Sequence, residues 1–134
     1  MSEVLIATNG YKDTRQAIEY GAWFAARMRT KITLLGVTEK LNPAAIDDHH
    51  PLEDVFESAV SLFKDHGVEY SLEVQNGEAE QVIPEKANRG DYITVVSPLG
   101  RPPIRRWLTG RSIRPLMEKI KGPILYVPQT RLPV

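Results

Sequence analysis

The sequence has no cysteine, no long apolar run and no excess of charge of either sign. Without Cys, disulfide frameworks, thiolate nucleophiles and cysteine-ligated zinc or iron–sulfur sites are excluded. No segment approaches the roughly 18 apolar residues that cross a bilayer. The first ten residues also lack the basic and apolar regions of a signal peptide. We therefore expect a cytoplasmic protein with no membrane partner.

The charge is balanced over the whole chain but unevenly distributed along it. The 134 residues contain 17 basic and 17 acidic side chains, with 42% hydrophobic residues. Residues 39–90 carry a net charge of −8, whereas residues 91–134 carry +6. A basic segment in a neutral protein favours a local anion site, and we expect no nucleic-acid partner. The length and ordinary composition predict a single domain over residues 1–134.

Short apolar runs alternate with segments of helical periodicity. The apolar runs, bounded by turn residues, predict strands over 4–7, 32–37, 68–74, 91–96 and 124–127. The periodic segments predict helices over 14–29, from Pro51 to Gly67, from Asn76-Gly77 through Ala87, and from Ser112 or Ile113 to Ile120. Pro84 lies inside the third of these helices and is expected to kink or shorten it.

This alternation predicts an α/β fold with one five-stranded parallel sheet and helices on both faces. In such open sheets a ligand binds beyond the carboxyl ends of the strands, where the strand order reverses. The loops that reach this edge follow the first, second and fourth strands, over residues 8–12, 37–40 and 97–112. A functional site is therefore expected among these three segments.

The loop after the fourth strand carries the most informative pattern. Gly100 and Gly110 bracket nine residues, and Gly110 stands just before a predicted helix. Glycine lets backbone N–H groups approach an oxyanion, and a helix N-terminus adds partial positive charge. The pattern predicts a phosphate-binding loop that lacks the lysine of a P-loop.

With these residues the chain resembles the universal stress protein family. Its nucleotide-binding members carry Gly, two residues, Gly, nine residues, and Gly followed by Ser or Thr. Gly100 and Gly110 match the second and third glycines, and the opening VLIATNGYKDTRQAIEYGAWFA is similar to the family's first strand, turn and helix. The resemblance covers nearly the whole chain. It implies a flavodoxin-like sheet with strand order 3-2-1-4-5 and a homodimer.

The resemblance also implies an adenine nucleotide lying across the first and fourth strands, as ATP or AMP, with Mg²⁺. Base and ribose would contact Ala7, Thr8 and Asn9, and the backbone of Val37 would meet the adenine. The glycine loop and the helix after it would hold the phosphates. The residues implied there are Val96, Ser97, Gly100, Arg101, Gly110, Arg111 and Ser112.

Three positions depart from the family pattern. Ser97 replaces the first glycine, Asn9 replaces the usual Asp, and Arg111 replaces the Ser or Thr after the third glycine. Asn keeps a hydrogen-bonding group for a ribose but loses the strength that a charge adds. Ser97 narrows the approach of a phosphate, whereas Arg101 and Arg111 supply attraction for it.

These observations lead to one principal hypothesis and two alternatives. The principal one is a regulatory stress-response binding protein, not an enzyme, that takes ATP or AMP through residues 97–112. Its homodimer would form through the edge strand from Ile124 to Val127, and its protein partner is unknown. The alternatives are an interaction module that has lost nucleotide binding, and a weak nucleotide hydrolase or phosphotransferase.

Overall fold

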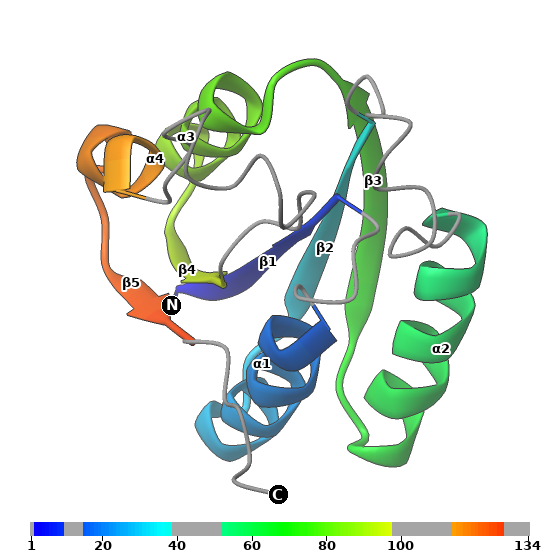
Figure 1. The fold of residues 1–134 in the computed structure, drawn as a ribbon. Helices are drawn as coiled ribbons and strands as arrows, with labels where there is room; N and C mark the ends of the chain where they lie inside the picture. The colour runs from blue at the N-terminus through cyan, green and yellow to red at the C-terminus, as the bar shows by residue number, and fades with distance from the viewer. Residues whose placement is uncertain (1, 10–14, 39–51, 98–113, 128–134) are drawn as a thin grey trace, which may run out of the picture.

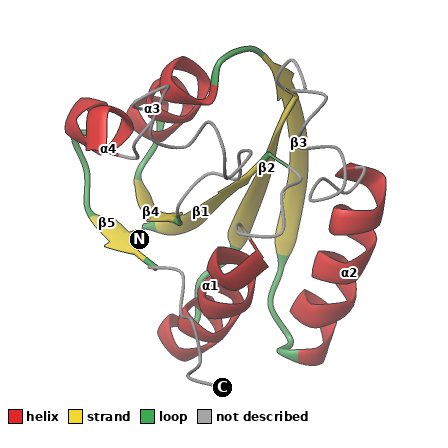
Figure 2. Cartoon of the chain, in the orientation of Figure 1, coloured by secondary structure: helices red, strands yellow, loops and turns green. Residues whose placement is uncertain are grey.

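The computed structural model describes residues 2–9, 15–38, 52–97 and 114–127. They form a parallel sheet between two layers of helices (Figures 1 and 2). The strands are β1 (Glu3–Thr8), β2 (Ile32–Thr38), β3 (Tyr70–Asn76), β4 (Tyr92–Val96) and β5 (Ile124–Tyr126). The helices are α1 (Arg15–Met28), α2 (Leu52–Asp65), α3 (Ala79–Arg89) and α4 (Arg114–Lys119).

The strand order is β3-β2-β1-β4-β5, which confirms the predicted fold class and topology. All four neighbouring pairs are parallel, and β1 stands in the middle. In one rung of the sheet Ile6 lies between Leu34 of β2 and Val95 of β4. The chain steps toward β3 after β1 and toward β5 after β4, so the order reverses between these two central strands.

Each face of the sheet has its own apolar core. Alternate side chains of β1 divide between them: Val4 and Ile6 join the cluster under α1 and α2, while Leu5 and Ala7 join the cluster under α3 and α4. Val4, Leu5 and Ile6 are fully buried. The sequence of such a strand is a continuous apolar run, because helices cover both faces of the sheet and the side chains on both faces are buried.

One glycine sets how closely α1 approaches the sheet. A Cβ placed on Gly21 would lie 2.4 Å from the Cδ1 atom of Ile6, well inside van der Waals contact. The helix therefore rests directly on β1 at this point. A larger residue here would push α1 away from the strand that anchors both cores.

The bounds of β3 differ from the prediction, whereas the end of α2 agrees with it. The third strand was expected over residues 68–74, but β3 runs Tyr70–Asn76. Gly67 ends the helix with φ +68°, as its position predicts, and the N–H of Val68 donates to the carbonyl of Phe63 at 3.0 Å. Val68 therefore belongs to the hydrogen-bonded helix end, so the strand starts two residues later.

The predicted effect of Pro84 on α3 is also partly wrong. The helix continues past the proline to Arg89, and Pro84 is buried within it. Beyond that point Asn88 joins α3 to α4: its side-chain amide donates to the carbonyl of Lys119 at 2.8 Å and accepts from the N–H of Lys121 at 2.9 Å. This contact satisfies backbone groups that the end of α4 leaves unpaired.

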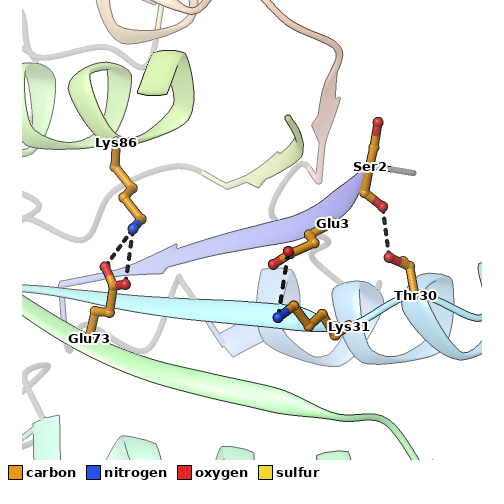
Figure 3. Close-up of polar contacts among 6 residues, drawn as sticks. All are labelled: Ser2, Glu3, Thr30, Lys31, Glu73 and Lys86. Carbon is orange, nitrogen blue, oxygen red and sulfur yellow. Dashed lines mark hydrogen bonds and ion pairs between the residues drawn. The ribbon is translucent and has the colours of Figure 1, made fainter. Parts of the chain in front are cut away.

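Two ion pairs join elements of the fold, one at the edge strand β3 and one at the start of the central strands (Figure 3). Lys86 of α3 reaches Glu73 of β3 at 2.9 Å, and Lys31 reaches Glu3 at 3.6 Å at the start of the sheet. The hydrogen bond to Glu73 raises the pKa of Lys86 above its ordinary value of 10.5, against an opposing effect of burial. Only 18% of the Lys86 side chain is exposed, so this ion pair is the better shielded of the two.

Replacing Lys86 with Met is expected to lower the unfolding free energy by about 1 kcal/mol at neutral pH, because a partly shielded, charge-assisted hydrogen bond is lost. The folded-state pKa of Lys86 lies above its unfolded value, so the ion pair contributes fully below pH 10.5 and is lost as the pH rises through the folded pKa. Urea denaturation of both proteins should therefore show a difference at pH 7 that shrinks above pH 10.5.

Arg89→Met is the matched control, since Arg89 pairs with Glu85 on the solvent side of the same helix. This variant should change stability by less than about 0.5 kcal/mol at either pH. An equal loss for the two variants, or a Lys86→Met loss that does not depend on pH, would contradict the assignment.

Candidate functional site

The candidate site is the edge of the sheet where β1 and β4 end side by side. Parallel strands bring their carboxyl ends to one edge, and in open sheets of this kind ligands bind where the strand order reverses, which here is between β1 and β4. Thr8 and Asn9 lie at the end of β1, and Ser97 directly follows β4. The three polar residues come from two neighbouring strands and from segments almost 90 positions apart.

Six of the predicted site residues fall in the described part of the chain, and all six are buried. They come from the carboxyl halves of β1, β2 and β4 and the positions just after them, and each is less than 5% exposed: Ala7, Thr8, Asn9, Val37, Val96 and Ser97. Ala7, Val37 and Val96 share the apolar cluster under α3 and α4. The structure thus brings these residues to one edge of the sheet, on the three central strands.

The other five predicted residues lie outside the described residues. They are Gly100, Arg101, Gly110, Arg111 and Ser112, all in the loop that follows β4. The described edge therefore contains the part of the predicted site assigned to base and ribose, together with the first residue of the predicted phosphate loop.

The hydroxyl of Ser97 at this edge is buried, with only 3% of the residue exposed. Within the part of the chain that the structure describes, it has no hydrogen-bond partner. A buried hydroxyl without a partner costs about 1–3 kcal/mol, so native structures keep few of them. Thr94, three residues earlier on β4, has a second unpaired hydroxyl, but it lies inside the strand and not at its end.

Side-chain hydrogen bonds of Thr38 join the end of β2 to the end of β3, and they were not predicted from the sequence. The hydroxyl of Thr38 bonds to the side chain of Asn76 and, at 3.3 Å, to the carbonyl of Gln75. The N–H of Gly77 donates to the carbonyl of Thr38 at 3.1 Å, with Gly77 at φ +137°. The Asn76-Gly77 pair was the sequence feature that could have indicated this contact. It was predicted to begin α3, but both of its residues instead bond to Thr38 at the end of β2.

The chemistry of the described edge is hydrogen bonding between neutral groups. Thr8, Asn9 and Ser97 carry no ionisable side chain. Among the residues that the structure describes there is no cluster of three metal-ligating side chains, and no helix is long and apolar enough to cross a membrane. Within those residues the edge is suited to binding a polar ligand, and it offers no general base.

An open cavity of about 560 Å³ lies at the other end of the sheet. It is lined by the segments that lead into the strands, including Glu3, Lys31 and Glu69, and by the ends of α1 and α2 at Arg29 and His66. The carbonyl ends of two helices face this cavity, and the basic side chains there complement them. It is therefore separate from the candidate site.

Several solved structures that resemble this chain are complexes with nucleotides. A universal stress protein in complex with cAMP superposes with a TM-score of 0.73 at 19% identity, covering 96% of this chain and 98% of its own. An Arabidopsis thaliana family protein with AMP bound gives 0.68 at 18%, covering 97% and 93%. An Archaeoglobus fulgidus protein in complex with dAMP gives 0.63 at 16%, covering 94% and 97%.

At these identities the likeness to solved structures shows the fold alone. No protein of curated function matches the chain. The family assignment comes from the sequence, because the model of the universal stress protein family matches residues 1–128. Nearly the whole chain is covered by that match, and the chain belongs to the universal stress protein family.

Proposed function

We propose that this protein is a regulatory module that binds an adenine nucleotide, AMP or ATP with Mg²⁺, where β1 and β4 end. The observation that carries the proposal is the buried, unpaired hydroxyl of Ser97 at that edge. A ligand that seats over the ends of the two strands would give this hydroxyl its partner. Relatives of the same fold with cAMP, AMP and dAMP support the choice of ligand class.

The described residues favour binding over catalysis. Asn9 and Thr8 carry amide and hydroxyl groups that suit a ribose or base, and Val37 and Val96 supply apolar surface on the two strands that flank β1. A bound nucleotide would favour one conformation of the segment 97–112 over others. If a protein partner also prefers one of these conformations, the nucleotide would change the affinity for that partner. The regulatory output is thus a population shift, for which no turnover of the nucleotide is needed.

The proposal includes a homodimer built through β5. The N–H of Thr94 donates to the carbonyl of Pro123, and the N–H of Val127 donates to the carbonyl of Val96. Residues 123, 125 and 127 thus face β4, which turns the backbone groups of Ile124 and Tyr126 away from the sheet. Tyr126 is 44% exposed, and a two-fold pairing centred on Leu125 would bring only uncharged residues together.

Replacing Ser97 with Ala is expected to weaken AMP binding about five- to thirty-fold, which corresponds to one lost neutral hydrogen bond of about 1–2 kcal/mol. The ligand-free variant should be as stable as the parent or slightly more stable, because an unpaired hydroxyl is removed. Isothermal titration with AMP, and with ATP in the presence and absence of Mg²⁺, measures the affinity.

Thr94→Val is the matched control, because it removes the other unpaired hydroxyl of β4. It should keep the parent affinity while showing the same effect on stability. Equal affinities of Ser97→Ala and the parent would overturn the assigned contact. Failure of AMP and ATP to bind the parent at millimolar concentration would leave the interaction-module alternative in place.

Replacing Tyr126 with Asp is expected to convert the dimer into a monomer, because a carboxylate would enter the apolar pairing of two β5 strands. Sedimentation equilibrium at micromolar protein measures the mass. Val74→Asp places the same charge on the opposite edge strand, where Val74 is 54% exposed, and should leave the dimer intact. A monomeric parent, or dissociation of both variants, would refute pairing through β5.

A further inference from the structure

The strand β3 leaves the other edge of the sheet open. It is the outermost strand on its side, and it is seven residues long, against three for β5 (Figure 1). No described strand lies beyond it. Its pairing with β2 runs one-to-one from Ile32↔Tyr70 to Thr38↔Asn76, so the edge is regular and has no bulge.

Hydrogen bonds at both ends of β3 show which of its backbone groups face outward. The N–H of Ile32 donates to the carbonyl of Glu69, and the N–H of Gly77 donates to the carbonyl of Thr38. Residues 69, 71, 73, 75 and 77 therefore turn their backbone groups toward β2, because these groups alternate along a strand. Tyr70, Leu72, Val74 and Asn76 turn their N–H and C=O groups away from the sheet.

The outward-facing residues also expose apolar side chains. Leu72 is 40% exposed and Val74 is 54% exposed. Soluble proteins protect such edges with proline, lysine, bulges or very short strands, none of which β3 has, or with an inward-pointing charge, which β3 has at one position. Its one charged side chain, Glu73, points to the opposite face, toward Lys86 of α3 (Figure 3).

A second copy of this chain is a poor partner for the edge. An antiparallel two-fold pairing that uses all seven residues is centred on Glu73. It places each Glu73 directly opposite its mate, at a position where the Cα atoms approach to roughly 4.5 Å. Like charges directly opposite each other destabilise a strand pair. The corresponding pairing of β5 is centred on Leu125 and carries no such penalty.

The charge around β3 instead suits a basic partner. Glu69 precedes the strand and is exposed, and Glu73 keeps 38% of its side chain exposed beside Lys86. Glu53, Asp54 and Glu57 are exposed on α2, the helix that packs against β3. We propose that β3 is a strand-addition site for an extended segment of another protein, with apolar side chains beside Leu72 and Val74 and a basic side chain beside Glu73.

Strand addition of this kind draws its affinity from backbone hydrogen bonds and its specificity from alternate side chains. The probe is a nine-residue peptide of alternating Val and Lys, compared with a scrambled peptide of the same composition and with an alternating Val and Glu peptide. We expect the first to bind at least ten-fold more tightly than either of the others, by fluorescence anisotropy. Hydrogen exchange at the amides of Leu72 and Val74 should slow in the complex.

Val74→Pro removes one outward N–H without touching the bonds to β2, and it should weaken binding of the alternating Val and Lys peptide at least ten-fold. Val74→Thr keeps the N–H and should bind within about three-fold of the parent. Both variants should retain the parent's response to AMP, so that failure here is distinguishable from failure of the proposed nucleotide site.

A charge reversal provides a second variant that preserves the ion pair. The double substitution Glu73→Lys with Lys86→Glu should reduce the preference for the alternating Val and Lys peptide over the alternating Val and Glu peptide, because a cation then lies at the midpoint of β3. Equal binding of ordered and scrambled peptides, or of the parent and Val74→Pro, would overturn the proposal. So would dissociation of the parent dimer by Val74→Pro, because a second copy would then be the occupant of β3.

Discussion

The burial of β1 on both faces is the constraint on which the rest of the fold depends. Its side chains alternate between the two apolar cores, and its backbone is paired on both sides, so α1, β2 and β4 are all positioned against it. Gly21 shows how tight this arrangement is, since α1 contacts Ile6 where any side chain would collide. Displacing β1 would disturb both cores at once.

The position of β1 also determines where polar side chains can meet a ligand. A strand buried on both faces exposes its functional groups only at its ends, and here the carboxyl end carries Thr8 and Asn9 beside Ser97. These groups are uncharged. Any recognition by these groups would therefore be independent of pH over the physiological range. The Ser97 hydroxyl has no partner among the described residues, and buried polar groups of this kind are rare in native structures.

The sequence predicted most of the fold because each element carried its own signal. The apolar runs of β1 and β4 and the periodic faces of α1 and α2 needed no tertiary information. The errors had two different causes. Pro84 remains inside α3, where the packing of that helix on the sheet overrides the local rule. Val68 is held by a local hydrogen bond to Phe63 at the end of α2, which takes precedence over the alternating pattern of residues 68–74.

The site was less predictable than the fold. Ala7, Thr8, Asn9 and Val37 were all assigned through the family resemblance, and their roles stay a prediction. The bond between Thr38 and Asn76 depends on the register of β2 and β3, which no local pattern reveals. Whether the Ser97 hydroxyl finds a hydrogen-bond partner among the described residues depends on all of its neighbours in space. The sequence around position 97 therefore does not predict that it is unpaired.

The placement of Glu73 has a consequence for how far assembly can proceed. A dimer joined through β5 would have ten strands in one continuous sheet, with a copy of β3 at each end. Two open, regular edges would normally let such dimers add to one another and grow into filaments. The carboxylate at the midpoint of β3 opposes that growth, because every junction in full register would set two of them face to face. Repulsion between Glu73 residues would thus oppose polymerisation through β3, while a chain without an acidic residue at that position could still pair with the strand.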